Sequence, residues 1–163
     1  MFAALRVISK EFTLKPGFIN LETEKDLFKK LEYDYERLKC EPNNTYIAFD
    51  LFVTASHIAD WLKKGHGKEA SNFRNNHAIL QVCDHLGCGA KHFSLNNPKH
   101  VSVVSAEKSK YVEDGYFEND YVEEPLEITL ETTQAELLGV NNPVSVINLA
   151  ELAICFWKAQ LNT

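Results

Sequence analysis

An apolar stretch over residues 44–64 constrains the fold more than any other part of the chain. It contains neither glycine nor proline, and apolar side chains recur at helical spacing around most of its circumference. A helix of this kind has to be covered by other elements. The stretch therefore predicts a central core helix around which the remaining chain packs. The row on its most apolar side consists of Ile47, Leu51, Ala55, Ile58 and Leu62.

A polar stripe interrupts the apolar surface of this helix. Asp50, Thr54, His57 and Lys64 fall on one helical face, and Asp60 lies beside it. Polar groups on a buried helix need hydrogen-bond partners. The stripe therefore predicts either a satisfied internal network or the wall of a functional site.

Local signals predict one helix before the central helix and one after it. Thr23 is a suitable N-cap for the first, which is expected to run to about Cys40. The next is expected to begin near Lys68 and to end at Gly87, because two glycines close together weaken a helix. The short connection over residues 65–67 predicts that the second and third helices are antiparallel neighbours.

The periodicity changes from helical to alternating after residue 98. Apolar and polar residues then alternate in two stretches, which is typical of half-buried strands. Two or three strands are expected, with an exposed acidic hairpin or meander over residues 112–124. The apolar positions of the alternation, which are expected to face inward, are Val101, Val103, Leu126, Ile128 and Leu130.

Helical periodicity returns near the C-terminus, where Asn142 is expected to cap a last helix with Pro143 at its first position. Weaker patterns predict short strands over Ala4–Ile8 and Phe12–Leu14. The predicted fold is a single, mainly α domain: an antiparallel four-helix bundle with a small antiparallel β insertion before the last helix. Its parts are an N-terminal extension (1–21), helices one to three (22–95), an acidic β insertion (98–135) and a C-terminal helix (142–161).

The charge is distributed unevenly. The net charge is −6, but residues 1–110 hold 16 Lys and Arg against 13 Asp and Glu. Residues 111–157 contain ten acids and neither Lys nor Arg. We interpret the acidic part as a solvated surface, with a docking face for a basic partner or a mimic of nucleic-acid charge as alternatives. Sustained non-specific binding of nucleic acid is not expected, because it needs a basic surface.

The four cysteines are irregularly spaced and form no C-x-x-C pair. They are expected to be reduced thiols that pack as small apolar residues. The apolar run near the N-terminus, Phe2 to Leu5, is too short for a signal sequence or a membrane span, so no membrane association is expected. These features together predict a cytoplasmic protein.

His57 and Asp60 form the first candidate pair for chemistry. They lie three residues apart on one helical face, and a histidine oriented by a carboxylate is the basic unit of general-base or ligand chemistry. It is equally the basic unit of a satisfied core histidine. Trp61 adds an indole donor beside the pair. We therefore predict Asp60 and Trp61 as binding residues. A third predicted binding residue, His85, belongs to a second cluster over residues 83–92.

A second cluster of cysteine and histidine lies within residues 83–92. If the helix continues through the glycines, His85, Cys88 and His92 line one face at metal-ligand spacing. Cys83 would then lie well around the helix from Cys88, so a four-ligand grouping fails unless the backbone bends. Zinc stays the alternative for this cluster; we assign no metal ligand and expect no cofactor.

Both segments resemble those of a group of small bacterial proteins of unknown function. That group shares a T-A-x-H-x-x-D-W helix, which matches Thr54–Trp61, and a closing helix with F-W, which matches Phe156-Trp157. Its later I-C-R-D-x-A-N-G-[SA]-K-H segment is matched at Cys83, Gly89, Lys91 and His92. The chain departs from that segment with Asp84 for Arg, His85 for Asp and Cys88 for Asn. The resemblance covers residues 22–161.

More weakly, the layout is similar to the HEPN helical domains of prokaryotic defence and toxin systems. HEPN domains that cleave RNA use an R-x4-6-H motif near a dimer interface. No arginine of this chain is followed by a histidine at that spacing, because the step from Arg74 to His77 is too short. The resemblance therefore implies a helical fold more than it implies nuclease activity, and a dimer is possible under it.

Two functions follow as hypotheses. The first is a non-enzymatic binding or regulatory module that binds a protein partner or a second copy of the same chain. The second is a metal-independent RNase-type hydrolase, in which His57 and His92 act as acid and base and Lys91 stabilises the phosphate charge. The second requires the predicted packing of helices two and three to bring these side chains into one cleft.

Overall fold

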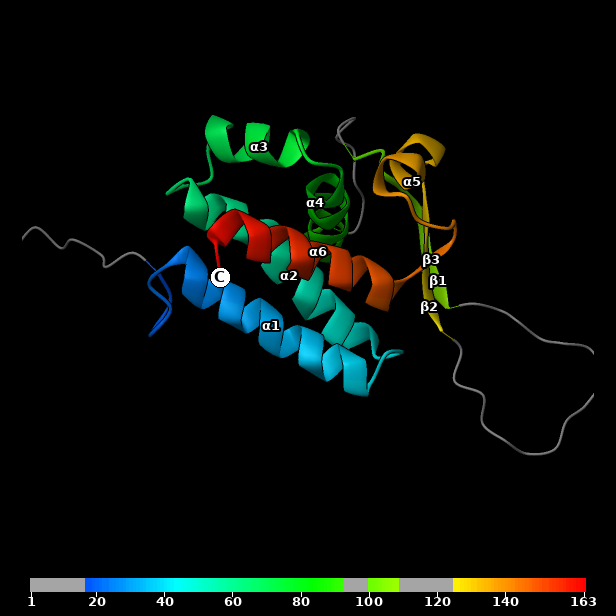
Figure 1. Cartoon of the computed structure of the whole chain (residues 1–163), viewed down its shortest axis with the longest axis horizontal. Coiled ribbons are helices and arrows are strands. Elements are labelled where there is room, and N and C mark those ends of the chain that lie inside the picture. Colours follow the sequence, from blue (N-terminus) through cyan, green and yellow to red (C-terminus); the bar gives the residue numbers. More distant parts are fainter. Residues whose placement is uncertain (1–16, 93–99, 109–124) are drawn as a thin grey trace, which may run out of the picture.

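The computed structural model describes residues 17–92, 100–108 and 125–163. The predicted N-terminal strands and the predicted acidic hairpin lie outside these ranges. The described elements are α1 (Glu24–Cys40), α2 (Thr45–Leu62), α3 (Lys68–Asn75), α4 (Ala78–Lys91), β1 (Val103–Lys108), β2 (Leu126–Leu130), α5 (Thr132–Leu138), β3 (Val144–Ser145) and α6 (Val146–Leu161) (Figure 1).

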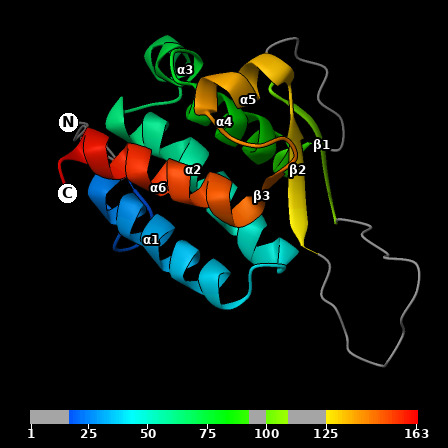
Figure 2. The same ribbon diagram turned by 45° about the vertical axis from the view of Figure 1, so that its right-hand side comes forward.

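The helix α2 is central, as its apolar circumference predicts. The side chains of Leu51, Ala55 and Ile58 have no exposed surface, and α2 packs against α1, α3, α4 and α6. The indole of Trp157 on α6 donates a hydrogen bond of 3.1 Å to the carbonyl of Ala55. Figures 1 and 2 show α1, α2 and α6 side by side. The fold is therefore mainly helical and is built around the predicted helix.

Side-chain caps mark the starts of the first two helices, and Thr23 is the cap predicted for the first. Thr23 and Asp26 form a capping box at the start of α1, and the side chain of Asn44 accepts hydrogen bonds from the backbone of Tyr46 and Ile47 at the start of α2. Both caps satisfy backbone N–H groups that have no partner inside the helix. Glu41 is the C-cap of α1, one residue beyond the expected end.

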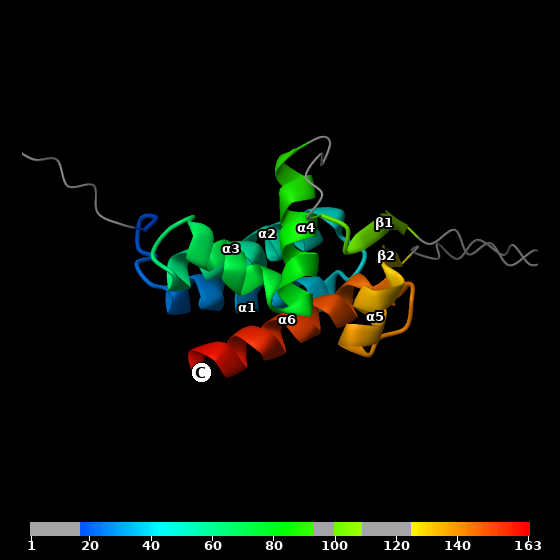
Figure 3. The same ribbon diagram turned by 90° about the horizontal axis from the view of Figure 1, so that it is seen from above.

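The predicted third helix is two helices. It breaks at Asn76 and His77, where the ring of His77 lies 2.8 Å from the carbonyl of Phe73 and Gln81 donates to the carbonyl of Asn75. These side chains satisfy the carbonyl groups at the end of α3. The prediction that the helix ends at Gly87 is wrong, since α4 continues to Lys91. Figure 3 shows α4 running across α1, α2 and α6 instead of alongside them.

Gly87 allows this crossing because α4 comes very close to α2. A Cβ atom at Gly87 would lie only 2.7 Å from the hydroxyl of Ser56 and 3.3 Å from the carbonyl of Phe52. A Cβ atom here would require the Ser56 hydroxyl to turn away and the neighbouring atoms of α2 to move by a few tenths of an ångström. The glycine therefore serves close packing inside the helix and does not end it.

A small antiparallel sheet precedes the last helix, as expected, in the order β1-β2-β3. Leu126, Ile128 and Leu130 on β2 are buried, which confirms their predicted direction. In the other stretch the prediction is wrong for Val101, which is exposed while Ser102 is buried. Ser102 is held inside because its hydroxyl donates to the carbonyl of Gln81 on α4.

The last helix starts later than predicted, and a helix that was not predicted precedes it. α5 follows β2 directly, and α6 is capped by Ser145, whose hydroxyl accepts from the backbone of Asn148. Asn142 does not cap a helix. Its side-chain amide pairs with the N–H and the carbonyl of Leu130, at 2.9 Å each, and so extends the sheet. Over the described ranges there are six helices where four were expected. None of them is long and apolar enough to span a membrane.

Candidate functional site

The polar stripe of α2 contributes residues to two separate polar clusters. Asp50 and Thr54 face α1, where the Thr54 hydroxyl lies 3.4 Å from the fully buried carboxylate of Asp34. His57 and Asp60 face α3 and α4 instead. The predicted single stripe is therefore divided between two helix interfaces, and only its second half meets the Cys/His segment.

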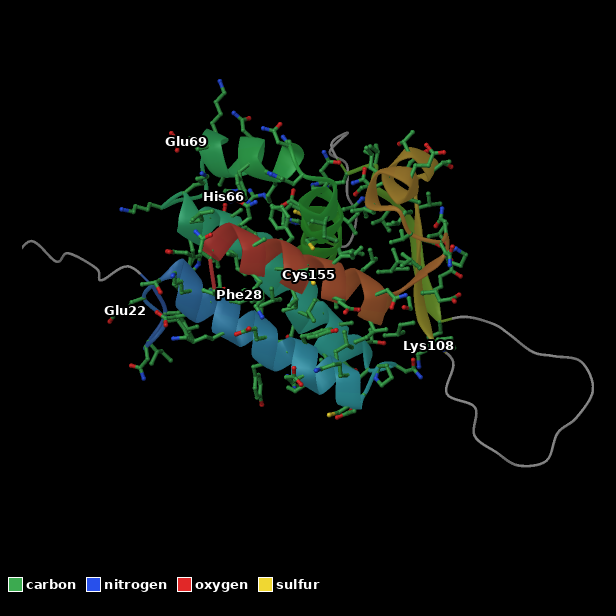
Figure 4. The ribbon with its side chains drawn as sticks, viewed as in Figure 1. Glu22, Phe28, His66, Glu69, Lys108 and Cys155 are labelled. Carbon is green, nitrogen blue, oxygen red and sulfur yellow. The ribbon has the colours of Figure 1, made fainter. Side chains whose placement is uncertain are left out.

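A buried arginine connects Asp60 to α4. Arg74 on α3 is only 4% exposed. Its Nη1 donates to Asp60 at 2.8 Å, and its Nε lies 3.0 Å from Asp84 in an ion pair that lacks hydrogen-bond geometry. Asp60 also lies 3.1 Å from Nδ1 of His66. His66 belongs to the turn between α2 and α3 and is labelled in Figure 4. One cation is thus held between two carboxylates from different helices.

The contacts of His57 define its tautomer. Its Nδ1 lies 2.6 Å from the carbonyl of Val53, so Nδ1 carries the proton and donates. The other nitrogen, Nε2, is then an acceptor and contacts Lys91 Nζ. The predicted approach of His57 and Lys91 is confirmed. As arranged, the basic nitrogen of His57 already has a partner.

The other predicted residues of this group lie differently. His92 is the exposed C-cap of α4, next to Lys91 in the chain. Trp61 is partly buried and packs against the hydrophobic core, which gives its ring a structural role. Of the three residues of the hydrolase hypothesis, the structure brings two into contact.

His85 fastens the sheet to α4. Its Nδ1 accepts from the backbone N–H of Val103 at 3.2 Å and lies 3.3 Å from the hydroxyl of Ser102. Burial lowers the pKa of His85, the neighbouring His100 lowers it further, and Asp84 opposes both. The ring is therefore neutral near pH 7, with its proton on Nε2. His85, one of the predicted binding residues, therefore anchors β1 to α4.

The cysteines are all free thiols, as expected, but their surroundings differ. Burial raises the pKa of Cys83 to about 12, so this thiol packs as a small apolar side chain. Cys88 is half-buried, and burial raises its pKa, an effect that Asp84 adds to and that Lys91 and Arg74 oppose. Cys88 thus lies among several charged side chains of the polar cluster.

Asp84, Cys88 and His100 come together at this point. One ligand-type atom from each, the carboxylate oxygen, the sulfur and a ring nitrogen, all lie within 4.8 Å of one another. The grouping expected from helical spacing was His85, Cys88 and His92. The observed cluster uses Asp84 and His100 instead, because the chain before β1 returns to α4.

A different feature of the same region is an apolar groove with a volume of about 300 Å³. It lies between α2, α4, the first two strands and the start of α6. Its charged lining residues are Glu107, Lys108 and Glu127, and Figure 4 labels Lys108 at the end of β1. Its main apolar lining residues are Phe49, Phe52, Leu86, Ala90, Ala106 and Ile128.

An irregularity of β1 gives the groove one of its walls. The pairing of β1 with β2 shifts between Val103 and Ser105, so that Val103 opposes Leu130 and Ala106 opposes Ile128. Because side chains alternate along a regular strand, Val103 and Ala106 share a face only through this bulge. Ala106 therefore lines the groove, while Val104 is exposed.

An exposed aromatic side chain lines the groove. Phe49 lines it and is still 48% exposed, and Tyr46, one turn earlier on α2, is 84% exposed. Exposed aromatic residues next to an apolar hollow are typical of binding surfaces.

Comparison with known proteins finds no match for this chain, neither among family models nor among curated proteins or solved structures.

Proposed function

We propose that the chain is a non-catalytic binding module that takes up apolar side chains of a basic protein partner in the groove between α2, α4 and the sheet. The observation that carries this proposal is the groove itself, which is apolar inside and lined by the exposed ring of Phe49. Pockets of this volume are at the lower end of the range for specific ligands. A few inserted side chains would fill it.

The polar cluster supports binding over catalysis. Asp60 is engaged by Arg74, and the basic nitrogen of His57 is engaged by Lys91. A general base has to be within reach of the proton that it removes. Side chains that already pair with one another on three helices are better explained as a network that fixes α2, α3 and α4.

Charge indicates the chemistry of the partner. Lys108 and Leu126 line the groove, and the residues between them in the sequence that carry charge are six acids and Lys110. Two further carboxylates, those of Glu107 and Glu127, line the groove. A partner with Lys or Arg on either side of its apolar anchor would gain from this field, both in association rate and in specificity.

A pair of synthetic peptides tests the proposal. Both form amphipathic helices with leucine at every third or fourth position, and they differ only in having lysine or glutamate at the polar positions. We expect the lysine peptide to bind with an affinity that falls as salt is added, and the glutamate peptide to bind much more weakly. Fluorescence anisotropy of labelled peptides measures both.

Two variants of β1 show whether the peptide uses the groove. Ala106→Trp fills the groove from an exposed position, and we expect it to weaken the lysine peptide by about 10-fold or more. Val104→Trp is the matched control, since Val104 is exposed on the same strand and is not a groove residue. Equal affinities for the two peptides, or equal losses in the two variants, would contradict the proposal.

The contact between His57 and Lys91 favours hydrolysis of RNA as the second candidate. It predicts RNA cleavage that is lost in a folded His92→Ala variant. The binding-module proposal predicts no cleavage that depends on His92. It also predicts that His57→Ala lowers stability by about 1 kcal/mol, because the hydrogen bond of the ring to the Val53 carbonyl and its contact with Lys91 are lost, while the Ser56 hydroxyl still donates to that carbonyl. A structural relation to HEPN-like helical domains is a further part of this proposal.

A further inference from the structure

Three different donor atoms converge on one side of α4. Asp84 and Cys88 lie four residues apart on this helix, and His100 comes from the chain that leads into β1. Their oxygen, sulfur and nitrogen atoms lie within 4.8 Å of one another, and all three residues are half-buried. Residues four apart on a helix face the same way, so the turn presents two ligands and the returning chain adds the third.

This donor set has the chemistry of a zinc site. Zinc binds thiolate at about 2.3 Å and imidazole or carboxylate at about 2.0–2.2 Å, in tetrahedral geometry. Such distances space the ligand atoms about 3.5 Å apart. The three atoms would have to approach by roughly 1 Å, which side-chain rotation supplies. Hard cations such as Mg²⁺ or Ca²⁺ prefer oxygen ligands only and fit the set poorly.

Neighbouring groups already hold these ligands in place. Arg74 Nε lies 3.0 Å from Asp84 Oδ1 in an ion pair, and the ring centroids of His85 and His100 lie 5.5 Å apart. His85 is itself fastened to the backbone of β1. Outer groups that orient the ligands are a regular part of metal sites. The cluster thus differs from a chance meeting of mobile surface side chains.

The surrounding charges are balanced. Lys91 and Arg74 are the cations that act on Cys88, and Asp60 and Asp84 are the anions. Asp60 is paired with Arg74, which limits the repulsion that the arginine exerts on a metal ion. A zinc ion with one thiolate and one carboxylate ligand would be neutralised by its own ligands.

We propose that Asp84, Cys88 and His100 bind one zinc ion, with a fourth position open to water or to a group of a partner. The ion ties α4 to the chain that enters β1. Both elements line the apolar groove, through Leu86 and Ala90 on one side and Ala106 on the other. Zinc therefore sets the distance between two walls of the groove. The site stands on its own geometry and does not depend on the proposed binding function.

Titration of the purified full-length chain with zinc, after treatment with a chelator, tests the site by calorimetry. Cobalt(II) serves as a spectroscopic probe, since a thiolate ligand gives a charge-transfer band that imidazole and carboxylate do not. We expect one equivalent of zinc to bind. Cys88→Ser should abolish the charge-transfer band, and Asp84→Asn and His100→Gln should each weaken zinc binding by at least about 10-fold.

Two matched controls remove the same residue types elsewhere. Cys155→Ser removes an exposed thiol on α6 (Figure 4), and His66→Gln removes an exposed imidazole. Both should bind zinc as the parent does. Circular dichroism establishes that each variant is folded; if a variant of α4 unfolds, His100→Gln decides, because His100 lies outside the helices.

Three results would overturn the proposal. One is a parent protein whose dissociation constant for zinc exceeds about 1 mM. Another is a charge-transfer band that survives in Cys88→Ser. The third is a folded His100→Gln variant that binds zinc as tightly as the parent.

Discussion

Replacing Arg74 with methionine removes the cation that α3 places between α2 and α4. Arg74 is 4% exposed, and the side chains of its partners Asp60 and Asp84 are 13% and 26% exposed. Methionine keeps the apolar stem of the side chain but leaves two carboxylates without their counter-ion in a half-buried place. The variant therefore tests whether this cluster is a structural network.

The expected loss follows from the burial of these groups. Breaking a buried ion pair by removing one partner costs about 3–5 kcal/mol. Because Asp84 can regain some water, we expect a value near the lower end, about 3 kcal/mol. For a chain of this length that loss corresponds to a decrease in Tm of about 6–12 °C. Lys39→Met is the control: it breaks a 2.7 Å pair with Glu36 at the surface, where we expect Tm to stay nearly unchanged.

A combined variant separates the loss of the pair from the cost of leaving carboxylates unpaired. Arg74→Met together with Asp60→Asn and Asp84→Asn removes the cation and both charges. It should be more stable than Arg74→Met alone, because no unpaired charge remains. Urea unfolding followed by circular dichroism, with EDTA present to exclude metal binding, measures all four proteins. Equal stability of Arg74→Met and Lys39→Met would refute the reasoning.

Two further predictions concern packing and pH. Gly87→Ala should destabilise the protein by about 1–3 kcal/mol in urea unfolding, because its Cβ would meet Ser56. Gly89→Ala, at an exposed position of the same helix, should be neutral or stabilising; equal losses in both would contradict the close approach. Hydrogen bonds from Thr23, Lys29 and Glu22 lower the pKa of Asp26 to about 2. A lowered pKa stabilises the folded state above the unfolded value of about 4, and this contribution is lost as the pH falls towards 2. Carboxyl titration by NMR checks it, and a pKa near 4 in the folded state would count against the capping box.

The first two helices could be predicted from sequence because their ends are marked locally. Thr23 with Asp26, and Asn44 after Pro42, are signals whose physics acts within one turn. The last helix shows the limit of such signals. Asn142-Pro143 has the residues of a helix start, but the amide of Asn142 pairs with β2, a contact that only the folded chain provides.

The candidate site was predictable only where it depended on helical spacing. The contact of His57 with Lys91 follows from two neighbouring helices. The positions of Arg74 and His100 depend on the angle at which α4 crosses α2, and no periodicity contains that angle. A weak signal was present for Arg74, which shares the buried face of α3 with Ala70, four residues earlier.

The groove had no local signal at all. Both Phe49 and Ala106 line the groove. Their local sequence predicts only a core helix for Phe49 and a strand for Ala106. The two residues line the same groove because β1 contains a bulge and because α4 crosses α2.

The most direct test of the binding-module account is to locate the bound peptide by NMR. Methyl spectra of a protein labelled at alanine and isoleucine report on the groove through Ala48, Ala90, Ala106 and Ile128, and on a buried position that does not line the groove through Ala70 on α3. During titration with the lysine peptide, the account predicts shifts confined to the groove methyls, with Ala70 unchanged. Shifts concentrated at Ala70, or absent at Ala106 and Ile128 while the peptide binds, would contradict it.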